Sequence, residues 1–123
     1  MRILIIEDDT EINYMLQILF QQNGYQTISA YSGTEGVLVH NKAVDLILLD
    51  LMLPGRSGEE IIRELKRNHN VPVIVMSAIH AVDKKVDLFS LGADDYVTKP
   101  FHNEELLARI RCVTRRSSPV SKA

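Results

Sequence analysis

Residues that could take part in metal or phosphoryl chemistry follow four short apolar segments of this sequence. In chain order they are Glu7, Asp8 and Asp9 after residues 3–6, Asp50 after residues 46–49, Ser77 after residues 73–76, and Lys99 after residues 96–98. Carboxylates about 4 Å apart repel by about 4 kcal/mol at an effective dielectric of about 20, so a cluster of them requires a cation or a raised pKa. A small set of oxygen ligands favours Mg²⁺, whose coordination is often completed by phosphate oxygens. Mg²⁺ with a phosphoryl group is therefore the first hypothesis.

The segments that must position these residues include five short apolar runs rich in β-branched residues. They predict β-strands at residues 3–6, 27–30, 46–49, 73–76 and 96–98. Four of the runs show little alternation, which is typical of strands covered on both faces in a parallel sheet.

Segments with helical spacing of apolar residues separate the strands. Ser32 and Ser57 each precede a glutamate by three residues, a capping-box pattern that begins a helix. Gly24 and Gly92 stand where a helix ends in a left-handed residue before the next strand. The resulting β-α order, five times over, predicts a flavodoxin-like (βα)5 doubly wound fold, a five-stranded parallel sheet with helices on both faces. Ligands of such sheets bind at the carboxyl ends of the strands, where the polar residues stand.

Composition and charge are those of one globular domain. The 123 residues, 46% hydrophobic and 24% charged, exclude a disordered chain, and a net charge of -2 excludes DNA or an anionic membrane as the direct ligand. Cys112 is the single cysteine, so no internal disulfide forms. His40, His69, His80 and His102 lack metal-ligand spacing and are expected on the surface. Without a membrane span or signal peptide, we expect a cytoplasmic protein.

Three motifs resemble those of the receiver domain of bacterial two-component response regulators, and within them the OmpR/PhoB-type subfamily. They are ILIIEDD at residues 3–9, DLILLDLMLPG at residues 45–55 and GADDYVTKPF at residues 92–101. The resemblance covers residues 1–116, which we expect to form the receiver domain, with residues 117–123 as a linker or tail. It implies that a winged-helix DNA-binding output domain, absent from this chain, controls transcription in the full protein.

The resemblance implies a metal site for Mg²⁺, with Mn²⁺ as an alternative. Asp8 and Asp50 would bind the ion directly, together with the backbone carbonyl of Met52. Glu7 stands where aspartate is common in the family, and its longer side chain favours contact through a metal-bound water.

The resemblance also implies a phosphorylation switch fed by a sensor histidine kinase. Asp50 would be the nucleophile and phosphoacceptor, Lys99 would pair with the phosphoryl group, and Ser77, where threonine is common, would donate its hydroxyl. Tyr96 would then turn inward and alter the surface formed by the fourth helix, the fifth strand and the fifth helix, which promotes a homodimer. The charged residues expected at that dimer interface are Lys85, Asp94, Asp95, Glu105, Arg109 and Arg116.

Simpler interpretations remain open for some of these residues. An acidic pair before a helix often serves only to cap it, a role open to Asp9 or Thr10 here. Acids at the start and arginines at the end of the last helix suit its dipole without any partner.

Two other functional classes fit the sequence less well. A phosphatase with an aspartate nucleophile would typically carry a second aspartate two residues later, where this chain has Met52. A flavodoxin-like nucleotide or flavin carrier would need a phosphate-binding loop after the first strand, where Glu7 and Asp8 would repel a phosphate. We therefore expect a phosphoacceptor switch that catalyses its own phosphorylation and dephosphorylation and is not a turnover enzyme.

Overall fold

The computed structural model describes residues 1–53, 55, 57–78 and 92–117, with the backbone alone described at residues 78, 116 and 117. The expected fourth helix, which would end at Gly92, lies outside the described residues, as do Lys85, His80 and the side chain of Arg116. α5 continues to Ser117, the first residue of the expected tail, and residues 118–123 are outside the description.

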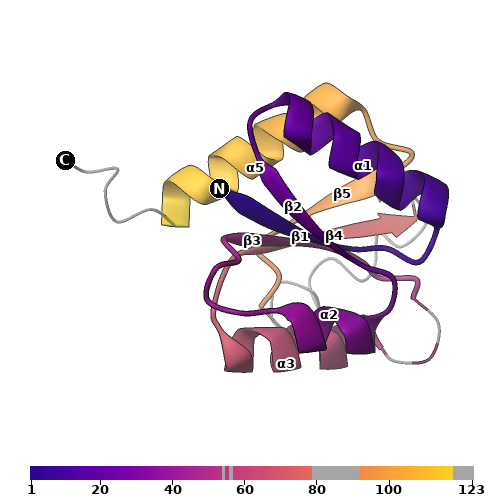
Figure 1. Ribbon diagram of the computed structural model, residues 1–123, viewed down its shortest axis with the longest axis vertical. Helices are drawn as coiled ribbons and strands as arrows, with labels where there is room; N and C mark the ends of the chain where they lie inside the picture. Colours follow the sequence, from indigo (N-terminus) through magenta and orange to yellow (C-terminus); the bar gives the residue numbers. More distant parts are fainter. Residues whose placement is uncertain (54, 56, 79–91, 118–123) are drawn as a thin grey trace.

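Five parallel strands form one sheet in the order β2-β1-β3-β4-β5 (Figure 1). The strands are β1 (Arg2–Ile6), β2 (Gln26–Ala30), β3 (Leu46–Asp50), β4 (Val73–Ala78) and β5 (Asp95–Lys99). Each is one or two residues longer than its predicted apolar run. This strand order is that of flavodoxin-like doubly wound sheets, so the predicted fold is confirmed.

Helices cover both faces of the sheet (Figure 1). α1 (Thr10–Gln22) and α5 (Asn103–Ser117) lie on one face, and α2 (Gly33–Val39) and α3 (Gly58–Asn68) on the other. Alternate residues of β1 supply the two cores, because successive strand side chains point to opposite faces. Ile3 and Ile5 pack in the core under α1 and α5, and Leu4 and Ile6 in the core against α3.

The predicted caps begin the helices. Asp9 begins α1, where its Oδ1 accepts hydrogen bonds from the backbone N–H groups of Glu11 and Ile12. Ser32 and Ser57 are the N-cap residues of α2 and α3. Their side chains accept hydrogen bonds from the backbone N–H groups three residues later.

The second capping bond at α2 differs from the predicted pattern. The Glu35 carboxylate reaches past Ser32 and accepts from the N–H of Tyr31 at 2.7 Å. Tyr31 directly follows Ala30, the last residue of β2. The Glu35 carboxylate therefore provides a hydrogen-bond partner for a backbone N–H just beyond the end of the strand.

His40 corrects the expectation that every histidine lies on the surface. It is the C-cap of α2, where its backbone N–H donates to the Gly36 carbonyl. Its side chain is buried and places Nε2 2.8 Å from the carbonyl oxygen of His69, the C-cap of α3. The two rings meet edge to face with centroids 6.0 Å apart. His69 and His102 are exposed, as predicted. Among the described helices, none is both long enough and apolar enough to cross a membrane.

Candidate phosphoacceptor and metal site

The register of the sheet brings the predicted site residues to one edge. Ile6 of β1 pairs with Leu49 of β3, so Glu7 and Asp50 emerge side by side at the point where the strand order reverses. Asp50 ends β3 and Lys99 ends β5, one residue inside the strands rather than after them. Ser77 lies within β4 and is buried.

Three carboxylates form the acidic cluster, which consists of Glu7, Asp8 and Asp50. One oxygen from each lies within 4.8 Å of the others. Glu7 and Asp50 are 1% and 3% exposed, whereas Asp8 is exposed. Buried carboxylates need partners or a counter-ion, because burial penalises the charged form.

Lys99 supplies the positive charge that the structure places in this cluster. Its Nζ donates to Glu7 Oε1 at 2.7 Å and to Asp50 Oδ2 at 3.1 Å. The remaining oxygen of each carboxylate accepts from the backbone two residues later: Asp50 Oδ1 from the N–H of Met52, and Glu7 Oε2 from the N–H of Asp9. The Lys99–Pro100 peptide bond is cis.

Burial and neighbouring charges shift the pKa values of Glu7 and Lys99. Burial raises the pKa of Glu7 to about 7; the hydrogen bond from Lys99 opposes this rise, and the nearby Asp50 adds to it. Burial lowers the pKa of Lys99, but its hydrogen bonds to Glu7 and then to Asp50 outweigh that effect and raise it above the ordinary value of 10.5. Glu7 therefore takes up a proton near neutral pH when no other cation is bound.

The donor set fits a divalent cation that prefers oxygen. Three carboxylates meet one ammonium among the described residues, and the exposed Asp8 leaves the cluster open to solvent. Hard oxygen ligands of this kind suit Mg²⁺ or Mn²⁺ better than metals that select sulfur or nitrogen. The N–H of Met52 points to Asp50, so the backbone of residue 52 lies beside the cluster, and the Met52 side chain is exposed.

The family of the chain follows from its sequence as a whole. Residues 3–111 match the response regulator receiver domain family. This chain belongs to that family.

Known relatives agree with this assignment. The receiver domain is 39% identical over 116 residues to the transcriptional regulatory protein CpxR of Klebsiella pneumoniae subsp. pneumoniae (strain HS11286), a match that covers 94% of this chain and 50% of that protein. The chain thus spans half the length of this curated relative. The relative is named as a transcriptional regulator, which agrees with the subfamily indicated by the motifs.

Solved receiver structures share the fold. The receiver domain of the Francisella response regulator 1452 superposes with a TM-score of 0.85 at 34% identity, covering 95% of this chain and 98% of that one. A response regulator receiver domain protein from Clostridium thermocellum superposes with a TM-score of 0.87 at 27% identity, covering 94% of each chain.

Several residues expected at a dimer interface of the receiver domain form pairs within the chain. Arg109 of α5 donates to Asp95 at 2.8 Å and to Glu105 at 3.3 Å, and its guanidinium lies 5.5 Å from the centre of the Tyr96 ring. Burial lowers the pKa of Arg109, but the hydrogen bond to Asp95 outweighs it and the pKa is raised. Tyr96 is half-buried against the core that includes α3.

Asp94 has partners away from α5. Its Oδ2 accepts from Lys66 of α3 at 2.8 Å and from the N–H of Val73 at 2.9 Å. These bonds tie the segment before β5 to α3 and β4, so Asp94 stabilises the domain itself.

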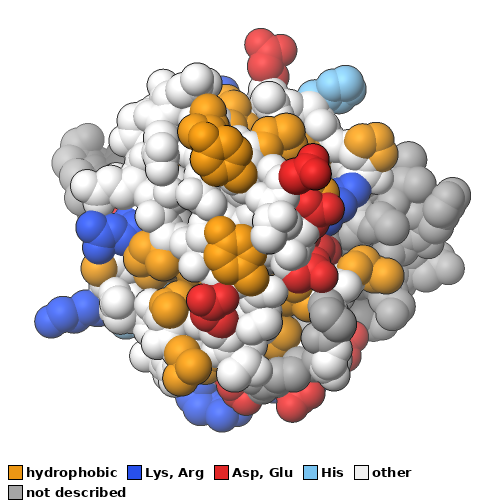
Figure 2. Space-filling view, turned by 45° about the vertical axis from the view of Figure 1, so that its right-hand side comes forward, with side chains coloured by type: hydrophobic (Ala, Val, Ile, Leu, Met, Phe, Trp, Pro, Cys, Tyr) orange, Lys and Arg blue, Asp and Glu red, His pale blue; other side chains and the backbone are white. Residues whose placement is uncertain are grey.

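An apolar surface adjoins the acidic cluster. A groove of about 480 Å³ runs between α1 and the start of α5, and its lining includes Met15, Lys99 and Phe101. Tyr14, Met15 and Ile18 of α1 continue this surface and are exposed. In Figure 2, which brings this side of the molecule forward, hydrophobic and acidic side chains lie next to one another. The apolar groove was not predicted. Its signal in the sequence was the presence of apolar residues in α1 beyond those on the buried face of the helix, namely Tyr14, Met15 and Ile18.

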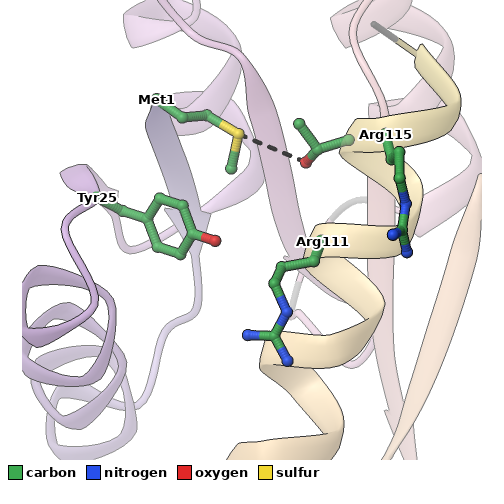
Figure 3. Close-up of a pocket in the computed structure, with 5 residues that line it drawn as sticks. Met1, Tyr25, Arg111 and Arg115 are labelled. Atoms are coloured by element: carbon green, nitrogen blue, oxygen red, sulfur yellow. Dashed lines mark hydrogen bonds between the residues drawn. The ribbon is translucent and has the colours of Figure 1, made fainter. Parts of the chain in front are cut away.

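A second hollow lies away from the acidic cluster, at the amino end of β1 (Figure 3). It measures about 390 Å³ and is lined by Met1, Tyr25, Arg111, Thr114 and Arg115. A hydrogen bond from the Thr114 hydroxyl to the Met1 sulfur crosses it at 3.4 Å. None of the described residues that line it is acidic, so the hollow differs in chemistry from the acidic cluster.

Proposed function

We propose that this receiver domain accepts a phosphoryl group on Asp50 from a sensor histidine kinase, in a reaction that depends on Mg²⁺. The observation that carries the proposal is the position of Lys99, whose Nζ bonds Asp50 and Glu7 together beside Asp8. A nucleophilic carboxylate, a fixed ammonium and a metal-binding acid pair are the parts that phosphoryl transfer to aspartate requires.

The proposed step needs no general base. An oxygen of Asp50 forms the new O–P bond as the N–P bond of a phosphohistidine on the kinase breaks, and the electron pair of that bond stays on the imidazole nitrogen. An ionised carboxylate has no proton to lose, so transfer depends on position and on neutralised charge. Lys99 would neutralise the incoming phosphoryl oxygens.

Mg²⁺, when bound, supplies the further positive charge that phosphoryl oxygens attract. Asp8, Asp50 and the Met52 carbonyl would hold the ion, and Glu7 would do so through water. The resemblance motivates this division of roles, and the carboxylate cluster supports it.

The apolar groove supports a kinase as the partner. It lies beside Lys99, and its exposed Met15 and half-buried Phe101 could pack against an amphipathic helix that carries the phosphohistidine. A helix seated there would bring its reactive side chain to the edge of the sheet where Asp50 ends β3.

Phosphorylation would alter a surface that includes β5 and α5. The added charge and acceptor oxygens would draw the Ser77 hydroxyl toward Asp50. We propose that Tyr96 then turns inward and that the ion pairs of Arg109 with Asp95 and Glu105 exchange for pairs across a two-fold axis. Such an interface needs charges of both signs on the same patch, and this patch has them.

The full protein would use this switch to control transcription. The relative CpxR, a transcriptional regulatory protein, is twice as long as the matched region, which supports a DNA-binding output domain beyond the receiver domain. In this proposal the receiver domain acts in the cytoplasm and binds DNA only through that further domain.

Beryllofluoride, a mimic of the phosphoryl group, tests the proposal. Amide shifts at Ser77, Tyr96 and Lys99 should change when Mg²⁺ and beryllofluoride are both present, and should not change in Asp50→Asn. Equal shifts in the Asp50→Asn protein would show that Asp50 is not the acceptor.

A further inference from the structure

Asn13 is a polar residue on the otherwise apolar inner face of α1. It is 0% exposed, as are Leu16 and Phe20 on the same face. Burial of an amide is costly unless its donors and acceptors are paired. The environment of Asn13 therefore has to supply several hydrogen bonds.

The side chain of Asn13 makes four hydrogen bonds. Its Nδ2 donates to the backbone carbonyls of Glu7 at 3.1 Å and Ala30 at 3.3 Å. Its Oδ1 accepts from Gln17 Nε2 at 2.8 Å and from Ser29 Oγ at 2.7 Å. This is the full capacity of an amide group, and the two carbonyls on one side and two donors on the other fix its orientation.

The two hydrogen bonds from Asn13 Nδ2 lie at the carboxyl ends of β1 and β2. The N–H of Glu7 donates to the carbonyl of Ala30 at 3.1 Å, just beyond the paired residues Ile6 and Ala30 that end β1 and β2. Asn13 joins the carbonyls of the same two residues, Glu7 and Ala30. The peptide backbone of Glu7 is thus held at both its N–H and its C=O.

The side chain of Glu7 is held as well. Oε1 accepts from Lys99 and Oε2 from the N–H of Asp9. A shift of the Glu7 backbone would therefore move one member of the acidic cluster directly and would move Asp8, the next residue, with it.

We propose that Asn13 is a positioning residue for the acidic cluster, one that sets where Glu7 and Asp8 stand relative to Asp50. The inference rests on the proposed function, since it concerns the same site. Groups that orient metal ligands act without touching the ion, and their loss typically lowers metal affinity roughly tenfold or more. Sites of this kind tolerate only small displacements of their ligands.

The test compares Asn13→Ala with Gln17→Ala. Gln17→Ala removes one bond to Asn13 Oδ1 and leaves both bonds from Nδ2 to the Glu7 and Ala30 carbonyls. Three quantities are measured in each protein: the dissociation constant of Mg²⁺ from amide shifts, the exchange rate of the Glu7 amide hydrogen without Mg²⁺, and the melting temperature.

Asn13→Ala should weaken Mg²⁺ binding roughly tenfold and should speed exchange of the Glu7 amide. Gln17→Ala should leave both close to wild type. A lower melting temperature in Asn13→Ala with unchanged Mg²⁺ affinity would assign Asn13 a purely structural role and overturn the inference. If Asn13→Ala does not fold, Asn13→Ser takes its place, because a hydroxyl can donate to at most one carbonyl. The same outcomes then decide the question.

The wild-type protein separates this inference from the proposed function. Wild type that neither binds Mg²⁺ nor accepts a phosphoryl group would contradict the proposed function. If the wild-type protein binds Mg²⁺ and accepts a phosphoryl group, and Asn13→Ala binds Mg²⁺ as tightly as wild type, only the role of Asn13 is contradicted.

Discussion

The ammonium of Lys99 lies closer to Glu7 than to Asp50, at 2.7 Å from Oε1 against 3.1 Å from Oδ2. One cation is thus shared between two buried carboxylates. A phosphoryl group on Asp50 would offer this cation stronger acceptors, and Lys99 would then move from Glu7 toward the phosphoryl oxygens. We therefore expect the position of Lys99 to respond to phosphorylation of Asp50.

Replacement of Lys99 should slow phosphorylation. A charge-assisted hydrogen bond contributes about 1.5 to 3 kcal/mol, so Lys99→Met should lower the rate with acetyl phosphate by roughly tenfold or more. Intact mass against time gives the rate. Lys42→Met, at an exposed lysine between α2 and β3, is the matched control and should react as wild type does. Equal rates in the two variants would remove Lys99 from the reaction.

Stability without a divalent cation should fall as pH rises from about 4.5 to about 7. Glu7 has an ordinary pKa of 4.5 and a pKa of about 7 in the folded protein, so in this range the folded state binds more protons than the unfolded state. The full difference corresponds to at most roughly 3 to 4 kcal/mol of unfolding free energy. Urea unfolding at several pH values in a chelator measures it.

Two controls identify Glu7 as the source of this pH dependence. Glu7→Gln should flatten it, whereas Glu104→Gln, at an exposed position in α5, should retain it. Added Mg²⁺ should also flatten it, because a cation favours the charged carboxylate. Stability that rises with pH over the same range would contradict the assignment.

The two acids after β1 should differ in their effect on Mg²⁺ binding. Asp8→Ala should weaken binding more than Glu7→Gln, because Asp8 is proposed to touch the ion and Glu7 to act through water. The dissociation constant follows from amide shifts on Mg²⁺ titration, since the chain has no tryptophan. Equal losses in the two variants would refute the proposed division of roles.

A phosphoryl mimic should favour a symmetric dimer, which Arg109→Glu should disrupt. Within the chain, Arg109 forms a part-buried pair with Asp95 and an exposed pair with Glu105. Exposed pairs contribute only about 0.2 to 1 kcal/mol each. The free domain should therefore sediment as a monomer, and its beryllofluoride complex as a dimer. A dimer that survives Arg109→Glu unchanged would place the interface elsewhere. Arg63→Glu, on α3, serves as the control for a charge change.

Much of the fold could be predicted because the strands are continuous apolar runs whose carboxyl ends must meet at one edge. That constraint alone placed Glu7, Asp50 and Lys99 together, although Asp50 and Lys99 proved to be the last residues of their strands. The acidic cluster and its ammonium therefore follow from strand order and residue type.

The residues that escaped prediction bind backbone groups distant in sequence. His40 reaches the carbonyl of His69, and Asn13 reaches that of Ala30, and no spacing rule relates such partners. The bond between Arg109 and Glu105 follows helical i, i+4 spacing, but the bond from Arg109 to Asp95 depends on how α5 packs against β5.

Intact mass after incubation with acetyl phosphate and Mg²⁺ tests the central claim most directly. Wild type should gain the mass of one phosphoryl group, and hydroxylamine should remove it, because acyl phosphates react with that nucleophile. Asp50→Asn should gain none, since an amide is not a nucleophile at this site. Asp45→Asn, at an exposed aspartate just before β3, should be labelled as wild type is. Undiminished labelling of Asp50→Asn, or no labelling of wild type, would contradict the account.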